Sequence, residues 1–215
     1  MVFLRGRPFR GVGFLWHKSL NSYVECLSSS ADGRVVAHKL HVNKHSILLF
    51  NLYFPCFNYS VAYKNELTSL CGFIENVLMS NSYDAVLMLG DNNFDIVRGH
   101  IGFDILNNIL QSADLCACDY LIDNGAVIHT YVNTALQSAS RIDHIFISNF
   151  LHPCIQCVKV IDSGANNSDH RPVQCVLNFS VAWHDLNVLT APNCTSIKNN
   201  NQYKLRWDKG NLTLL

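Results

Sequence analysis

Residues 140–148 read SRIDHIFIS, a stretch in which apolar and polar side chains alternate before a more continuous apolar end. Alternation of this kind, with β-branched and aromatic residues, predicts a β-strand. Successive side chains of a strand point to opposite faces, so Asp143 faces away from Ile142 and His144. Because a carboxylate on a buried strand is costly without a partner, Asp143 is a candidate functional residue.

Short apolar runs along the chain predict further strands at residues 11–16, 35–40, 47–54, 85–90, 126–132 and 173–179. Within residues 61–80 the apolar side chains fall at helical spacing, which predicts a helix with one buried face made of Leu67, Leu70, Ile74, Val77 and Leu78. Residues 101–112 predict a second, shorter helix. Strands interrupted by few helices indicate a layered α/β or α+β domain with sheets at its centre.

The composition is that of one globular domain with a sizeable core. Hydrophobic residues make up 49% of the 215 residues, charged residues 15%, and the formal net charge is zero. A neutral chain has no global field that attracts nucleic acid or an anionic membrane, so a polyanionic partner would be bound locally. The apolar runs are far below the ~20 residues that span a bilayer, and Arg5, Arg7 and Arg10 interrupt any signal-peptide core. We therefore expect a soluble, intracellular protein with no membrane partner.

The chain has nine cysteines, an odd number, so they cannot all pair within one chain, and we expect reduced thiols. Cys116 with Cys118, and Cys154 with Cys157, form two close pairs of the kind that can hold zinc. Cysteine is also among the most frequently buried residue types, and we favour buried thiols over zinc.

Two further polar motifs could carry chemistry. Residues 87–95 read LMLGDNNFD, so Gly90 makes a turn and Asp91 and Asn93 project from the end of a buried strand, where α/β proteins commonly bind ligands. Residues 168–170 read SDH. Each motif alone is also typical of a turn, an edge strand or a helix cap. Together they supply the acids, the amide and the histidine for metal-assisted attack of water on a phosphodiester.

Three motifs of the sequence resemble those of a known family. GDNN, SRIDHIFIS and SDHRPV, in that order, are similar to the signatures of the endonuclease/exonuclease/phosphatase superfamily. GRPFRGVGFLW, ILLFNLYFPC and SRIDHIFIS resemble more closely the apurinic-type endonuclease of LINE-like non-LTR retrotransposons, from about residue 6 to 179. The resemblance implies a DNase I-like α+β fold, a two-sheet β-sandwich flanked by helices in four layers (α/β/β/α). It also implies a DNA-nicking endonuclease that depends on Mg²⁺ or Mn²⁺.

The resemblance implies roles for three residues near the predicted strand ends. Asp91 matches the aspartate that activates water, and Asn93 matches the asparagine that hydrogen-bonds the phosphate. Tyr53 matches a tyrosine that contacts the region of the scissile phosphate, although a tyrosine in NLYFP is equally typical of a core.

Further roles follow for residues in the second half of the chain. Asp143 matches the acid that orients a histidine, His170, and Asp169 matches a metal-binding acid beside it. Thr130 and Ser140 match positions that contact the DNA backbone, although Thr130 is also an ordinary strand residue.

The sequence departs from the family pattern in two places. Asn92 stands where the family has phenylalanine or leucine, so we expect that loop to be less firmly held. The family also begins with a strand carrying an asparagine, a helix, and a strand ending in a metal-binding glutamate, and no segment here matches them. Glu25 follows residues 11–16 where the family's glutamate would precede them. The resemblance therefore implies an N-terminally truncated copy without the first strands and without that glutamate.

The domain is expected over residues 1–180. Residues 181–215 are polar and rich in asparagine, and KLRWDKGNL at 204–212 resembles the connector to a reverse transcriptase in such elements. The implied partners are DNA and a reverse transcriptase domain, and the implied location is the nucleus. Two alternatives stay open: a phosphatase or phosphodiesterase of the same fold acting on a lipid head group or nucleotide, and a non-catalytic relic of a retroelement.

Overall fold

A six-stranded mixed sheet forms the centre of the protein. The computed structural model describes residues 11–118, 129–162, 166 and 168–183. The strand order is β1-β2-β3-β4-β8-β5, in which β3 and β4 are parallel and the other neighbours antiparallel. The strands are β1 (Val24–Ser29), β2 (Val35–Val42), β3 (His45–Tyr53), β4 (Ala85–Asp91), β8 (Asp143–Ser148) and β5 (Leu115–Ala117).

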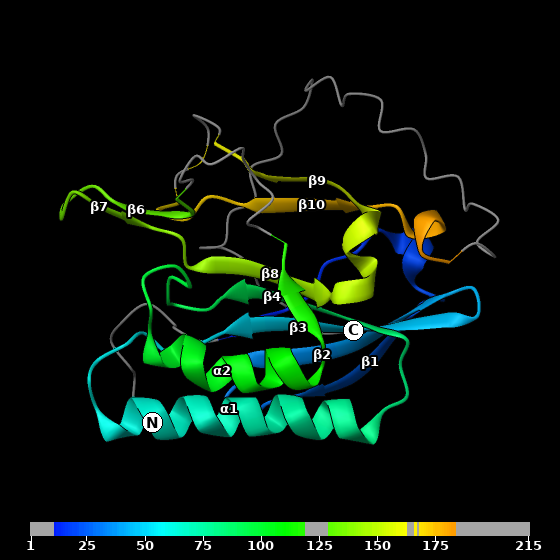
Figure 1. Ribbon diagram of the computed structural model, residues 1–215, viewed down its shortest axis with the longest axis horizontal. Coiled ribbons are helices and arrows are strands. Elements are labelled where there is room, and N and C mark those ends of the chain that lie inside the picture. Colours follow the sequence, from blue (N-terminus) through cyan, green and yellow to red (C-terminus); the bar gives the residue numbers. More distant parts are fainter. Residues whose placement is uncertain (1–10, 119–128, 163–165, 167, 184–215) are drawn as a thin grey trace, which may run out of the picture.

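Two α-helices cover one face of this sheet, α1 (Val61–Ser80) and α2 (Ile101–Ser112), as Figure 1 shows. Each begins at a capping side chain, since Ser60 Oγ accepts the backbone N–H of Tyr63 and His100 Nδ1 accepts that of Gly102. The predicted helices at 61–80 and 101–112 are confirmed. Leu78 is only partly buried, but the other residues of the predicted apolar face of α1 pack into the core: Leu67, Leu70, Ile74 and Val77.

A smaller sheet lies over the other face (Figure 1). It consists of β9 (Ile155–Val160) and β10 (Val173–Leu177), paired antiparallel, and short 3₁₀ helices at Asn149–Cys154 and Phe179–Val181 flank it. A second apolar cluster fills this side and includes Trp183, whose ring stacks on His45 at 4.4 Å between ring centroids. Packing therefore reaches Trp183, just past the predicted end of the domain at 180.

A hairpin of β6 (Tyr131–Asn133) and β7 (Ser138–Ser140) projects from the same end of the molecule at which β3 and β4 end (Figure 1). Within the described residues one more short element occurs, a 3₁₀ turn at Lys18–Leu20. Neither α-helix of the described part has the length and hydropathy needed to cross a membrane.

Most of the predicted strands are confirmed. The runs at 35–40, 47–54 and 85–90 form β2, β3 and β4, and those at 140–148 and 173–179 form β8 and β10. The prediction at 126–132 gives only the short β6, and residues 126–128 lie outside the described part. The short or more polar strands β1, β5, β7 and β9 were not predicted.

The predicted strand at 11–16 is wrong. This segment is irregular, with Val12 N–H bonded to the carbonyl of Gly33 and Asn51 Nδ2 bonded to the carbonyl of Gly13. Gly11 has φ +107°, a left-handed conformation that favours glycine, at the start of this irregular segment.

The layers differ in part from the predicted four. Helices, the six-stranded sheet and the β9–β10 sheet follow one another, whereas among the described residues no α-helix covers the outer side of β9–β10. The predicted tail beyond Trp183, with its 204–212 motif, and residues 1–10 lie outside the described residues.

Candidate active site

Three predicted site residues form one row across adjacent strands. In the parallel β3–β4 pair Tyr53 is the partner of Asp91, and in the antiparallel β4–β8 pair Asp91 is the partner of Asp143. The carboxyl ends of β3 and β4 therefore meet the start of β8 at one edge of the sheet. Residues far apart in the sequence are brought together by this register alone.

Gly90 allows the close approach of β3 and β4 just before Asp91. Its φ is +141°, and a Cβ built on it would lie 2.0 Å from the carbonyl oxygen of Leu52. Only glycine fits this backbone without displacing a strand. The glycine that the sequence suggested as a turn residue is needed within the sheet itself.

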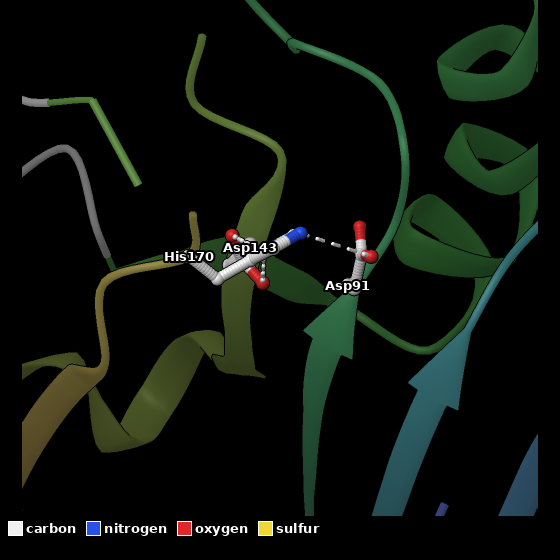
Figure 2. A group of neighbouring side chains, drawn as sticks. All are labelled: Asp91, Asp143 and His170. Atoms are coloured by element: carbon white, nitrogen blue, oxygen red, sulfur yellow. Dashed lines mark hydrogen bonds and ion pairs between the residues drawn. The ribbon is translucent and has the colours of Figure 1, made fainter. Parts of the chain in front are cut away.

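His170 lies between the two carboxylates (Figure 2). Its Nδ1 is 3.1 Å from Asp143 Oδ1 and 3.0 Å from Asp143 Oδ2, and its Nε2 is 3.9 Å from Asp91 Oδ2. The backbone of His170 forms a bridge with Tyr131, and its N–H donates to Ser168 Oγ at 3.0 Å. The predicted pairing of Asp143 with His170 is thus present in the geometry.

The electrostatics of this group favour a charged histidine and a partly protonated acid. The pKa of His170 is raised, mainly because its side chain hydrogen-bonds to Asp143. Burial, followed by the charge of Asp143, raises the pKa of Asp91 to about 6, against weaker opposing effects of the Asn93 N–H and His170. The site therefore concentrates negative charge in a half-buried place, which a cation would relieve.

The donor set fits a divalent cation. The ligand atoms of Asp91, Asp143 and His170 lie within 4.8 Å of one another, and the two carboxylates can bind a cation while His170 is charged. Carboxylate oxygen is the preferred ligand of Mg²⁺ and Mn²⁺. The structure places Asp169 outside this group, with an exposed side chain and a carbonyl that accepts the N–H of Val132. A metal-binding role for Asp169 stays a prediction.

Asn93 is held from several sides. Its φ is +54°, and its backbone N–H donates to Asp91 Oδ1 at 2.9 Å. Its Nδ2 donates to the carbonyl of Phe54 at 2.8 Å, and its Oδ1 accepts from the thiol of Cys56 at 3.1 Å. The amide thus ties the end of β4 to the segment after β3, and its predicted hydrogen bond to phosphate stays a prediction.

Thr130 has no exposed surface. Its hydroxyl accepts the backbone N–H groups of Ile142 and Asp143, each at 3.1 Å. The structure thus gives Thr130 a positioning contact with Asp143, while its predicted contact with DNA remains a prediction. Ser140 ends β7, and its carbonyl accepts the N–H of Thr130, so the predicted DNA contact of its side chain is likewise untested.

Tyr53 is partly buried and is held by Arg34. The Arg34 guanidinium lies 4.9 Å from the centre of the Tyr53 ring and donates to the Tyr53 carbonyl at 3.2 Å. Arg34 is itself buried and forms ion pairs with Glu66 at 3.0 Å and Asp32 at 3.5 Å. The ring therefore has both a structural partner and a position beside Asp91.

Asn92 is fully buried, in a place where the family resemblance implied an apolar residue. Neither its Oδ1 nor its Nδ2 has a hydrogen-bond partner within the described part of the chain. An unpaired buried amide is destabilising. The expectation of a less firmly held loop stays a prediction.

Sequence reasoning missed two residues that support the site, Cys56 and Arg34. Cys56 stands three positions after Tyr53, in the loop that follows β3, but its thiol contact with Asn93 depends on tertiary structure. Arg34 follows the turn signal Asp32–Gly33 directly before an apolar strand, and an arginine in that position could have suggested a buried ion pair.

Other candidates lie away from this edge. Glu25 is on β1, at the far side of the sheet from β8, and pairs with His41 at 3.2 Å. The four cysteines considered for zinc do not form a metal-binding group among the described residues, and Cys118 and Cys154 are buried. A cleft of about 340 Å³ borders the site, lined by Gly90, Asp143, His144, His170 and Arg171 among others.

Comparisons with solved structures identify the fold. The 3′ phosphatase NExo from Neisseria, bound to a product DNA hairpin, matches at a TM-score of 0.54 and 18% identity over 72% of this chain and 70% of that one. The endonuclease domain of TRAS1, a telomere-specific non-LTR retrotransposon, matches at 0.54 and 16% over 72% and 79%. The AP endonuclease LMAP from Leishmania major matches at 0.56 and 14% over 69% and 56%.

No family model matches the sequence, and a search of curated proteins gives no match either. The structural likeness over about 70% of the chain therefore defines a class by fold, the DNase I-like α+β fold of endonucleases, exonucleases and phosphatases. The predicted fold class is confirmed at this level.

Proposed function

We propose that this protein hydrolyses phosphodiester bonds of DNA with a divalent cation, as an endonuclease that nicks one strand. The observation that carries the proposal is the position of His170 between Asp143, at 3.0 Å, and Asp91, at 3.9 Å. A buried edge that gathers two acids and a histidine is unusual for packing alone and typical of a catalytic site.

In this proposal Asp91 is the base. A carboxyl with a pKa near 6 is ionised at neutral pH and still basic enough to take a proton from water. As the water oxygen bonds to phosphorus, its proton passes to Asp91 and the bond from phosphorus to the leaving ester oxygen breaks. His170, held protonated by Asp143, donates a hydrogen bond from Nε2 to a non-bridging phosphate oxygen.

Mg²⁺ or Mn²⁺ would be held by the carboxylate of Asp143, with Asp169 as a further candidate ligand, and would neutralise charge on the phosphate oxygens while Asp91 takes the proton. Asn93 and Tyr53 would contact the phosphate region, and Thr130 and Ser140 the DNA backbone. These assignments rest on the motifs that carry the family resemblance.

The retrotransposon part of the proposal rests on the sequence motifs and is supported by the likeness in fold to the TRAS1 endonuclease domain. In such an element the domain would act on nuclear DNA together with a reverse transcriptase domain. DNA is the proposed partner because the matched NExo structure holds a product DNA hairpin and the other two matched proteins are named as endonucleases.

The test is nicking of supercoiled plasmid by the purified chain, with Mg²⁺ or with EDTA. We expect nicking only with the cation, and at least ~100-fold less of it in His170→Ala. His41→Ala is the matched control, because His41 is exposed and pairs with Glu25 on the far strand. Nicking that survives His170→Ala, or a folded protein that never nicks, would overturn the proposal.

A phosphatase or phosphodiesterase acting on a smaller phosphoester is the second candidate. The formal net charge of zero favours it, since no global field draws in a long polyanion. Salt separates the two functions. Activity on DNA should fall steeply between 50 and 200 mM salt through counterion release, whereas hydrolysis of p-nitrophenyl phosphate should change little.

A further inference from the structure

The loop between β3 and α1, residues 54–60, carries an aromatic side chain that does not serve packing. Tyr59 is 91% exposed, and its backbone has φ +58°, in the left-handed region. Bulky side chains are rare in that region, which favours glycine, asparagine and aspartate. Because the ring stays in water, it contributes little hydrophobic stabilisation to the fold. Strain of this kind at an exposed site is a reason to look for a function.

The ring of Tyr59 has an aromatic neighbour on one side. It lies 4.3 Å from the ring of Phe57, measured between centroids. Phe57 in turn packs edge-on against Tyr63 at 5.1 Å and against His100 at 4.5 Å. Phe57 therefore joins Tyr59 to both helices, and the remainder of the Tyr59 ring faces solvent.

The backbone around Tyr59 is fixed as well. Asn58 Oδ1 accepts from both the backbone N–H of Ser60, at 3.1 Å, and its hydroxyl, at 2.6 Å. Ser60 is also the residue that caps α1. A ring presented on a rigid loop loses little conformational freedom when a ligand binds it.

The other end of the same loop is part of the candidate site. Phe54 N–H donates to the carbonyl of Asp91 at 2.9 Å, and the Cys56 thiol donates to Asn93. Three residues of extended chain span at most about 11 Å, so the Cα atoms of Tyr59 and Cys56 lie within that distance of each other. Residues 54–60 therefore connect the candidate site to Tyr59, at the end of the molecule where β3 ends and α1 begins.

We propose that Tyr59 is a stacking platform for an unpaired nucleobase of the DNA strand that is bound at the candidate site. The inference rests on the proposed function and adds a substrate preference to it, for DNA that is single-stranded or opened beside the site. A base within a duplex has both faces covered by its neighbours, so only an unpaired base can stack on the ring. Aromatic side chains bind bases of any sequence in this way.

The surroundings suit a nucleic acid. The neighbouring exposed residues include Asn58, Lys64 and Asn65, and the first turn of α1 contains no acidic residue. Lys64 and a helix N-terminus without carboxylates attract the negative charge of a phosphodiester backbone and do not repel it. The polar neighbours also interrupt the apolar surface that Tyr59 and Val61 would otherwise form, which favours a base over an apolar protein partner.

The test is equilibrium binding in EDTA, where no turnover occurs. The ligands are a single-stranded oligonucleotide and the matched duplex, each with 2-aminopurine at one of several positions, and anisotropy and quenching of the probe are measured on the full chain. We expect Tyr59→Ala to weaken single-strand binding about 5- to 150-fold and to abolish quenching, with little change for the duplex. Tyr59→Phe keeps the ring and should behave as wild type.

Tyr23→Ala, a partly exposed tyrosine next to β1, is the control for nonspecific loss of an aromatic ring. If Tyr59→Ala binds and quenches as wild type does, the stacking proposal fails alone, because metal-dependent nicking can still be present. If wild type binds neither oligonucleotide, the stacking proposal fails, and the nicking assay then decides the proposed function separately. If Tyr59→Ala weakens binding of the single strand and of the duplex equally, the stacking proposal is also overturned.

Discussion

The hydroxyl of Thr130 accepts the backbone N–H of Asp143 at 3.1 Å, although the two residues are 13 positions apart. The same oxygen accepts the N–H of Ile142 at 3.1 Å. One buried hydroxyl thus fixes the start of β8, from which Asp143 reaches His170. Thr130 is in this sense a positioning residue, acting on the histidine through the aspartate.

Replacing Thr130 by valine tests this relationship. Two backbone N–H groups would lose their acceptor, so we expect a loss of about 1–3 kcal/mol in the free energy of unfolding and a 10- to 100-fold loss of nicking. The specific readout is an NMR titration of His170, whose raised pKa should fall toward its ordinary value when Asp143 is displaced. Thr130→Ser keeps the hydroxyl and should retain both activity and pKa. An unchanged His170 titration in the valine variant would contradict the positioning role.

The raised pKa of Asp91 predicts how stability depends on pH. A carboxyl whose pKa is about 6 in the folded state, against 3.8 ordinarily, contributes stability that is fully present below 3.8 and is lost as the pH rises through 6. In metal-free buffer we expect Asp91→Asn to raise the free energy of unfolding by about 2–3 kcal/mol at pH 8, and by well under 1 kcal/mol at pH 4. Urea unfolding at both pH values measures this.

The control for that series is Asp162→Asn, a change at a carboxylate that is 71% exposed. An Asp91→Asn gain of the same size at pH 4 and pH 8 would show that the effect does not come from ionisation. Addition of Mg²⁺ should stabilise wild type more than Asp91→Asn, because the variant offers the cation one charge fewer.

Asn92 gives a prediction of increased stability. Leucine keeps the γ-branched shape and replaces an amide whose two polar atoms lack partners among the described residues. We expect Asn92→Leu to gain about 1–2 kcal/mol in thermal or urea unfolding. Asn65→Leu, at an exposed position of α1, is the matched control and should change stability by less than about 0.5 kcal/mol. A destabilised Asn92→Leu variant would indicate that the amide is satisfied or that the space is too small.

Two glycine-to-alanine changes should have opposite signs. Gly90→Ala places a Cβ 2.0 Å from the Leu52 carbonyl oxygen at a residue with φ +141°, so we expect a loss of at least about 2 kcal/mol and of nicking. Gly72 lies within α1 with open space around its Cβ position, and Gly72→Ala should gain about 0.5–1 kcal/mol. Similar stabilities of the two variants would contradict the close approach of β3 and β4 at Gly90.

The helices could be predicted because their signal is local. In residues 61–80 the apolar side chains repeat at helical spacing, and this repeat is preserved in the buried face of α1. The predicted strand at 11–16 failed because a short apolar run does not show whether another strand will pair with it. The strands β5 and β7 are too short to carry a repeating pattern.

The sequence by itself determined which chemical groups were available, the acids at 91 and 143 and the histidine at 170, and that Asp91 follows an apolar strand while Asp143 lies on one. Only the tertiary structure decided that Tyr53, Asp91 and Asp143 share one row, because strand register depends on pairing between segments far apart in the chain. The same holds for the contacts of Arg34, Cys56 and Thr130 with the site residues. A hydrogen bond between distant residues is set by packing of the whole sheet, and no local pattern in the sequence encodes it.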